Sequence, residues 1–292
     1  MAPLISFTSL ATLSMMFVFV EAQVPAMFVF GDSLLDPGNN NNLATLAKAN
    51  YFPNGIDFPE GVTGRYCNGR TVADYLGNLL GLPLIPPYNK PIITAHDTSR
   101  GVNFASAAAG ILNDTGKLYG DRFSMDSQIQ NFKRILEGLS SALVNGTEDY
   151  ISRSLFLVCM GSNDYINNFL LPLSQTASMY TAESFAELLI HEYSRQLKEL
   201  YELGARKFLI GGLGPLGCIP NQIGNYQNAS NIAKGQIICL PILPLECENR
   251  SDFIFWDPYH PTDRANSIVA EYAYNGTLQA SFPMNAMQLA LL

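Results

Sequence analysis

The stretch FVFGDSLLDPGNN, Phe28 to Asn40, places an apolar run directly before an Asp-Ser pair and a group of turn-forming residues. An apolar run bounded by turn signals is typical of a buried strand, and this one reaches back to Ala26. Ser33 then stands at the carboxyl end of a strand, where open α/β sheets bind their ligands. Taken alone, Ser33 fits two roles, a nucleophile or a residue that caps the turn together with Asp32.

Apolar runs alternate with helical patterns along the rest of the chain, and the further strand candidates are Gly101–Ser106, Leu155–Met160 and Lys207–Gly212. Helices are predicted after residues with capping side chains, which are Thr71, Ser124, Thr181 and Thr262. The long helix after Thr181 is expected to turn Leu200 and Tyr201 inward and to end at Gly204. This alternation indicates βαβ units, a mostly parallel sheet and the α/β class. No linker divides the series, so residues 23–292 are predicted to form a single domain.

The composition favours a folded protein that does not bind nucleic acid. Of 292 residues, 48% are hydrophobic and only 14% are charged, which is enough apolar material for a large core. The formal net charge is -8, and the 17 Lys and Arg residues are not clustered. Such a surface repels a phosphate backbone.

The first 22 residues are predicted to be a signal peptide. An apolar core from Ala11 to Val20 precedes the small-residue pattern Val20-Glu21-Ala22, after which cleavage is expected. The alternative is a membrane anchor, but the uninterrupted run is only about half of the roughly 20 residues that span a bilayer. We therefore expect a secreted protein, extracellular or in the cell wall, without a stable membrane anchor. Five glycosylation sequons fit that prediction, at Asn113, Asn145, Asn228, Asn249 and Asn275.

Two of the five cysteines are close enough in sequence for a small disulfide. Cys239 and Cys247 lie in a Pro-rich segment, and their pairing is a hypothesis from spacing alone. Cys159 lies inside an apolar run and is expected to act as a small buried hydrophobic residue. Between Pro220 and Ser251 the chain shows no clear helical pattern.

Polar residues follow three of the strand candidates, and a fourth polar cluster, Asp257 to Pro261, precedes the last helix. Hydrolytic acyl transfer needs a hydroxyl nucleophile, an imidazole, a carboxylate that orients it, and donors for the oxyanion. Of the three histidines, His96 and His191 are expected to be exposed or structural. His260 has a suitable setting three residues after Asp257, although isolated histidines are commonly structural. The Gly-x-Ser-x-Gly elbow of α/β-hydrolases is absent, because position 35 is Leu.

Four segments in order, FVFGDSLLDPGNNN, GVNFASAAAGIL, MGSNDYINNF and DPYHPTDRAN, resemble the four blocks of the plant GDSL esterase/lipase family, part of the SGNH hydrolase superfamily. The resemblance implies a flavodoxin-like fold with three layers, α/β/α. It also implies a secreted serine esterase or lipase that cleaves small-molecule acyl esters or lipids through an acyl-enzyme intermediate. No cofactor and no metal are expected.

The resemblance implies site residues at the positions of this chain that match the four blocks. The implied nucleophile, general base and orienting carboxylate are, in that order, Ser33, His260 and Asp257. The implied oxyanion donors are the backbone amide of Ser33, the side chain of Asn163, and a backbone amide of the second block. That last donor is assigned to Gly110, while Ala107 and Ala108 stand where many relatives carry glycines.

The chain departs from the family in one place. Only Asn221 to Ile238 stands where family members carry a long helix and the fifth strand, so this strand is expected to be missing. Its loss would expose a sheet edge and remove part of the support under Asp257 and His260. A second hypothesis is therefore a truncated, catalytically impaired glycoprotein that binds its ligand without turning it over. A metal-dependent hydrolase is a weaker third, since no cluster has the spacing of metal ligands.

Overall fold

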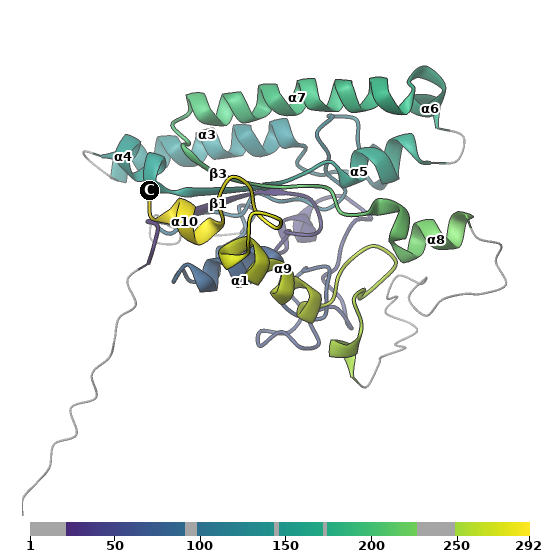
Figure 1. The fold of residues 1–292 in the computed structure, drawn as a ribbon, viewed down its shortest axis with the longest axis horizontal. Helices are drawn as coiled ribbons and strands as arrows, with labels where there is room; N and C mark the ends of the chain where they lie inside the picture. Colours follow the sequence, from purple (N-terminus) through teal and green to yellow (C-terminus); the bar gives the residue numbers. More distant parts are fainter. Residues whose placement is uncertain (1–21, 91–97, 143–145, 172–173, 227–248) are drawn as a thin grey trace, which may run out of the picture.

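The computed structural model describes residues 22–90, 98–142, 146–171, 174–226 and 249–292 (Figure 1). A parallel sheet lies at the centre and contains β1 (Met27–Gly31), β2 (Leu155–Cys159) and β3 (Lys207–Gly211) in the order β1-β2-β3. Met27 pairs with Leu155, and Leu155 pairs with Lys207, so the three strands start level. These strands confirm the three predicted from apolar runs.

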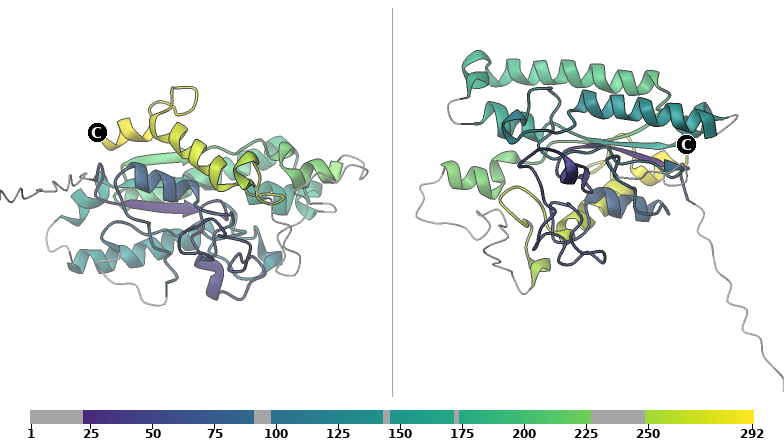
Figure 2. Two further views of the ribbon diagram at one scale, coloured as in Figure 1. Left: turned by 90° about the horizontal axis from the view of Figure 1, so that it is seen from below. Right: turned by 180° about the vertical axis from the view of Figure 1, so that it is seen from behind.

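Helices cover both faces of the sheet, as Figures 1 and 2 show. One face carries α3 (Met125–Ala142) and α7 (Ala182–Glu202), and the other carries α1 (Val72–Leu79), α9 (Asp263–Asn275) and α10 (Ala286–Ala290). Alternate β1 residues point to opposite faces, so Phe28 and Phe30 enter one core while Met27 and Val29 enter the other. The predicted three-layer α/β/α fold is confirmed.

Residues 100–106 run parallel to β1, as predicted, but as a less regular strand. The amide of Val29 donates to the Val102 carbonyl, and the amide of Phe104 donates back to Val29. Asn103 forms two isolated parallel bridges. One joins it to Val29 of β1, and the other joins it to Pro87 on the opposite side. Proline has no N–H group, so this neighbouring segment cannot extend the ladder.

The predicted caps are present at the helix starts. The hydroxyls of Thr71, Thr181 and Thr262 each accept a hydrogen bond from the backbone three residues on. Gly204 follows α7 with a φ of 106°, a conformation that favours glycine. The inward orientation expected for Tyr201 was wrong: its side chain is 52% exposed and lies under the guanidinium of Arg206. Leu200, one helical position earlier, occupies the core instead.

The segment after Pro220 contains a helix that the sequence pattern did not predict. α8 spans Pro220–Tyr226 and begins at a proline, which suits a first helical position because its missing N–H needs no partner there. The remaining short helices are α4 (Thr147–Arg153), α5 (Ser162–Asp164), α6 (Gln175–Met179), η1 (Asn39–Asn42), η2 (Lys117–Tyr119), η3 (Tyr165–Phe169), η4 (Leu216–Cys218) and η5 (Arg250–Asp252).

Within the described residues, β3 has a strand neighbour on one side only, and the side chain of Ile210 is 48% exposed. The expected loss of a strand at that edge stays a prediction, because residues 227–248 lie outside the described part of the chain. In the same part of the chain, no helix combines the length and the apolar character needed to cross a membrane. The predicted signal peptide up to Glu21, His96, the Cys239–Cys247 pair, Asn145 and Asn228 lie outside the described residues.

Candidate active site

Ser33, His260 and Asp257 meet at the carboxyl end of the sheet. The Oγ atom of Ser33 lies 2.7 Å from Nε2 of His260, and Nδ1 of the same ring lies 2.7 Å from Oδ2 of Asp257. Asp257 and His260 are both buried. A hydroxyl, an imidazole and a carboxylate in this chain of contacts match the requirements of a serine nucleophile with its general base.

The loop that carries the imidazole is held by its own backbone. Oδ1 of Asp257 accepts hydrogen bonds of 2.8 Å from the amides of Tyr259 and His260, which leaves Oδ2 for the imidazole. The amide of Trp256 donates to the His260 carbonyl at 2.7 Å, so the loop closes on itself. The indole of Trp256 donates to Oδ1 of Asn54 at 3.0 Å and ties the loop to the N-terminal half.

The start of α9, directly after this loop, is also bound to the N-terminal half. The carboxylate of Asp263 accepts from the amide of Arg70 at 2.6 Å and from the hydroxyl of Tyr75 at 2.8 Å. The amide of Asp263 donates to Asn68, and the side chain of Asn266 donates to the Arg70 carbonyl. Figure 1 shows α9 beside α1. These contacts support the imidazole without a further strand at the β3 edge.

Asn163 lies in the same cavity as the serine, and its amide is oriented by a chain of hydrogen bonds. Its Nδ2 atom donates to the Ala109 carbonyl at 2.9 Å, and its Oδ1 atom accepts from Nδ2 of Asn167 at 2.7 Å. Tyr119 continues the chain with a 3.3 Å contact to Oδ1 of Asn167. An amide nitrogen has two N–H donors, so one remains for a ligand.

Gly110, the predicted backbone donor of the second block, does not line the cavity, whereas Ala107 and Ala108 do. A Cβ atom at Gly110 would lie 2.6 Å from Oδ2 of Asp164, so glycine is required there for close packing. The amide of Ala107 is taken by Asp36 at 3.0 Å. Among the described residues, the amide of Ala108 donates to no protein acceptor. The geometry therefore favours Ala108 over Gly110 as the donor.

Ala108 has a φ of 63°, the one positive value among the described residues other than glycine. Alanine is strained in this left-handed region because its Cβ approaches the following carbonyl. The special role of this position cannot be recognised from the sequence, because it depends on the backbone angle rather than on residue type. The one available signal was the pair of alanines that replaces glycines of the family.

The asparagines after Ser33 join the first block to the second, a role that the sequence analysis did not predict. Nδ2 of Asn39 donates to the carbonyls of Asn103 and Ala105, and Nδ2 of Asn40 donates to the Ala107 carbonyl. Asp36 accepts from the amides of Gly38, Asn39 and Ala107. The run DPGNN has the composition of a turn in which Asp bonds the following amides. These contacts fix the loop that follows Ser33 against the loop that carries Ala108.

Asp164 fixes the third block against the second in the same way. Its carboxylate accepts from the amides of Ile111 and Leu112 and from the hydroxyl of Thr115, at distances of 2.6 to 3.0 Å. Burial raises the pKa of Asp164, while these donors oppose the rise. Asn163 is thus held at a set position by its neighbour in sequence.

Burial also affects the protonation of the carboxyl group of Asp32, the residue before Ser33. It raises the pKa of Asp32 to about 6, although the Leu34 amide at 3.0 Å and the nearby His260 favour the ionised form. Asp36 is equally buried, and its pKa is also raised to about 6 by burial against the pull of its amide donors. Asp32 and Asp36 therefore ionise at a higher pH than is usual for aspartate.

A cavity of about 450 Å³ lies beside Ser33, His260 and Asp257. Its apolar lining includes Leu46, Ile166, Leu216, Ile219, Ile254 and Val269. Of these, Leu46, Ile254 and Val269 are more than half exposed, so the rim of the cavity is apolar as well as its wall. Such a lining beside a polar reacting centre is typical of sites that take small apolar ligands.

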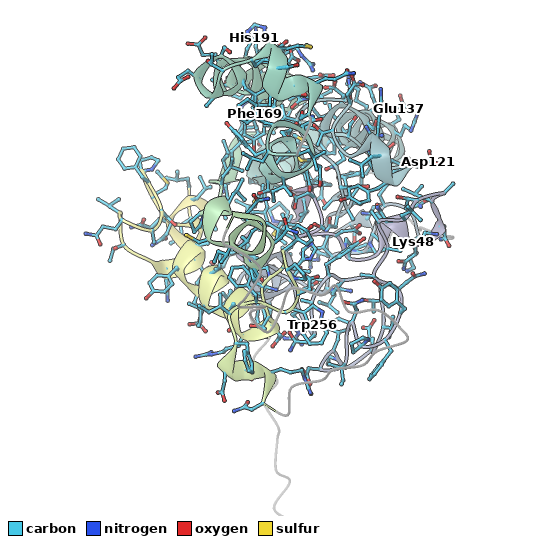
Figure 3. All side chains as sticks on the ribbon, turned by 90° about the vertical axis from the view of Figure 1, so that its right-hand side faces the viewer. Lys48, Asp121, Glu137, Phe169, His191 and Trp256 are labelled. Carbon is cyan, nitrogen blue, oxygen red and sulfur yellow. The ribbon has the colours of Figure 1, made fainter. Side chains whose placement is uncertain are left out.

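The other predicted residues lie away from this cavity. His191 is exposed on α7, and Figure 3 shows it at the opposite end of the molecule from Trp256. Asn113, Asn249 and Asn275 are exposed sequons. Cys159 is partly buried against the core, and Cys67, Cys159 and Cys218 are unpaired. No group of three or more His, Cys, Asp or Glu side chains in the described part of the chain is arranged to hold a metal ion.

Comparison with known proteins gives a consistent assignment. Residues 27–273 match the family described as GDSL-like lipase/acylhydrolase. GDSL esterase/lipase At1g71691 of Arabidopsis thaliana is 41% identical over 92% of this chain and 86% of its own length. GDSL esterase/lipase 7 of the same plant is 39% identical over 92% of each chain. The first alignment has 334 positions, more than this chain has residues, so that relative carries residues without a counterpart here. The chain belongs to the GDSL-like lipase/acylhydrolase family and is a hydrolase of acyl esters.

Proposed function

We propose that the protein is a secreted serine esterase that cleaves carboxylic acyl esters through an acyl-enzyme intermediate. The observation that carries the proposal is the 2.7 Å contact of Ser33 with His260, whose ring is in turn 2.7 Å from Asp257. Ser33 is the nucleophile, His260 the general base, and Asp257 holds the ring in the required orientation. The apolar cavity beside the serine supports an ester with an apolar acyl chain.

In the first half-reaction, the hydroxyl of Ser33 attacks the ester carbonyl carbon while its proton passes to Nε2 of His260. The carbonyl oxygen becomes an oxyanion, and its donors are the amides of Ser33 and Ala108 and the free N–H of Asn163. The bond to the alcohol breaks as His260 gives the proton to the leaving oxygen. Ser33 is then acylated, and the alcohol departs.

The second half-reaction repeats these steps with water. His260 takes a proton from water, and the resulting hydroxide adds to the acyl carbon. Collapse of the second tetrahedral intermediate returns the proton to Oγ of Ser33 and releases the carboxylic acid. Each residue thereby regains its starting state, and no cofactor takes part in these steps.

A fluorophosphonate probe tests the proposal directly, because it labels only an activated serine. We expect covalent labelling of the purified protein at Ser33 and hydrolysis of p-nitrophenyl butyrate. Both signals should disappear in Ser33→Ala and persist in Ser140→Ala, a matched change at an exposed serine of α3. A folded protein that neither takes up the probe nor exceeds the Ser33→Ala background would instead support a ligand-binding glycoprotein without turnover.

Secretion has its own test. The segment before Ala22 has the pattern of a signal peptide. We expect a fusion of residues 1–30 to a reporter to reach the medium of plant cells, and the mature protein to begin at Gln23. An intracellular product that retains residues 1–22 would contradict this part of the proposal.

A further inference from the structure

The aromatic ring of Tyr66 lies against the imidazole of His260. The two ring centroids are 4.8 Å apart, and the ring planes make an angle of 39°. The edge of the imidazole is held at two points, since Nδ1 lies 2.7 Å from Asp257 and Nε2 lies 2.7 Å from Ser33. A ring held at two points can still tilt about the line that joins them. A neighbour packed against the imidazole therefore restrains a motion that these two contacts leave open.

The backbone on both sides of Tyr66 is itself fixed. The guanidinium of the preceding Arg65 is buried, and its nitrogens lie 2.7 and 2.8 Å from the carboxylate oxygens of Asp74. The carbonyl of the following Cys67 accepts a hydrogen bond of 2.9 Å from the amide of Gly55. Tyr66 thus presents its ring to the imidazole from a segment that is held at the residue before it and at the residue after it.

The ring of Tyr66, not its hydroxyl, makes the contact with His260. The residue is half-buried and lines the cavity beside Ser33, whereas its hydroxyl is buried and has no hydrogen-bond partner among the described residues. A buried hydroxyl without a partner costs free energy rather than supplying it. Phenylalanine at this position would therefore keep the contact with His260 and remove only an unpaired group.

Tyr259 also approaches the imidazole, but at a greater distance. Its ring centroid is 6.1 Å from that of His260, and the planes are inclined by 59°. Tyr66 is therefore the closer of these two rings. Close packing matters at this position, because a misplacement of a catalytic group by about 1 Å can cost on the order of 10²-fold in rate.

We propose that Tyr66 is a positioning residue whose ring restrains the tilt of the His260 imidazole and so keeps Nε2 directed at Ser33. This inference rests on the proposed serine esterase function. The ring takes no proton and forms no bond in the reaction. Its effect reaches the ester only through His260, and this property separates it from a residue that binds the substrate or merely supports the fold.

Substitution of the ring tests the inference. Tyr66→Leu and Tyr66→Met fill the space without a flat, rigid ring, and each should lower kcat for p-nitrophenyl butyrate about tenfold or more. Tyr66→Phe retains the ring and should keep kcat within about twofold of wild type. Tyr201→Leu is the matched control, because it removes an exposed ring of α7 that lies under Arg206, and it should keep the wild-type rate.

A double-mutant cycle with His260→Ala shows whether the ring acts through the imidazole. When the imidazole is absent, Tyr66→Met should change the residual rate by less than about twofold, because residues that act as a unit are not additive. A loss of the same size in both backgrounds would overturn the inference, since the ring would then act on the substrate or on the fold.

Three further results would overturn the inference. These are an unchanged kcat in the folded Leu or Met variant, a rise in KM without a fall in kcat, and a loss in Tyr66→Phe as large as about tenfold. The last result decides against the ring even where the Leu and Met variants do not fold. A wild-type protein that neither cleaves the ester nor takes up a fluorophosphonate would instead refute the serine esterase function itself, which is a distinguishable result.

Discussion

The Nε2 atom of His260 lies 2.7 Å from the Oγ atom of Ser33, although 227 positions separate the two residues in the chain. Ser33 follows β1, whereas His260 belongs to a loop that pairs with no strand of the sheet among the described residues. The contact depends on the segments that hold this loop, namely Asn54 through Trp256 and Arg70 through Asp263.

Asp257→Asn should abolish most activity and leave the fold intact. The amide retains an oxygen for the backbone donors but loses the charge that stabilises the protonated imidazole and selects its tautomer. We expect kcat to fall by about 10⁴-fold. Initial rates with p-nitrophenyl butyrate measure the loss, and circular dichroism checks the fold. Asp252→Asn, a change at an exposed carboxylate, is the control and should keep the wild-type rate. Equal rates for the two variants would exclude Asp257 from the mechanism.

Asn167→Leu should impair the reaction through Asn163. Without the 2.7 Å bond from Asn167, the amide of Asn163 loses the contact that fixes its orientation. Removal of one oxyanion donor costs about 10² to 10³ in kcat, so a misdirected donor should cost about tenfold or more. KM should change little, because the oxyanion forms only in the transition state.

The control for this prediction is Asn168→Ala, one position further along. That change removes a 2.8 Å bond to Thr115 and keeps both direct hydrogen bonds of the Asn163 side chain. Its kcat should stay close to wild type. A larger loss in Asn168→Ala than in Asn167→Leu would show that packing of the segment, not the amide of Asn163, limits the rate.

Ala108→Gly should stabilise the protein. Glycine adopts the φ of 63° without the steric cost that alanine carries, and this gain exceeds the extra entropy of the unfolded chain. We expect the free energy of unfolding to rise by about 0.5 to 1 kcal/mol. Urea denaturation measures the change. Ala109→Gly, at a buried position without positive φ, should lower stability instead, and a gain of the same size there would refute the assignment of strain to Ala108.

Stability should fall as the pH rises from about 4 to about 6, in part because of Asp32. Its pKa in the folded protein is raised to about 6, so the folded state keeps a proton that the unfolded chain has already lost. Ionisation of Asp32 therefore opposes folding: the penalty is absent below the unfolded pKa near 4 and complete above about 6.

Asp32→Asn removes this ionisation and serves as the test. The free energy of unfolding of the variant, relative to wild type, should increase by about 2 kcal/mol between pH 4 and pH 7.5. Urea denaturation at both pH values gives the comparison. Asp149→Asn, at an exposed carboxylate of α4, should show no such trend. A variant that loses stability relative to wild type as the pH rises would contradict the sign of the shift.

Local signals explain which features the sequence predicted. β1, β2 and β3 are short apolar runs, and the helices after Thr71 and Thr181 begin at side chains that bond their own first turn. Burial and capping act within a few residues, so a single sequence is sufficient to find them. α8 was missed because a short helix that begins at Pro220 leaves almost no periodic pattern.

The candidate catalytic residues were identified by resemblance to a family, and the structure brings Ser33, Asp257 and His260 into contact. The geometry favours Ala108 over Gly110 as the backbone donor because Ala108 lines the cavity, and a sequence does not show which of these two residues does so. The roles of Asn39 and Asn40 were missed for a similar reason. Their partners lie more than 60 positions away, and no local pattern shows which carbonyls they meet.

The attachment of α9 to the N-terminal half determines where the length of the chain can change without moving His260. Asp263 and Asn266 fix the end of the Asp257–His260 loop to Arg70, and the amide of Asn221 donates to the Pro258 carbonyl on the other side of this loop. The chain length between Asn221 and Arg250 is therefore uncoupled from the distance between base and nucleophile. We therefore expect that this connection can be shortened or lengthened without moving His260 away from Ser33.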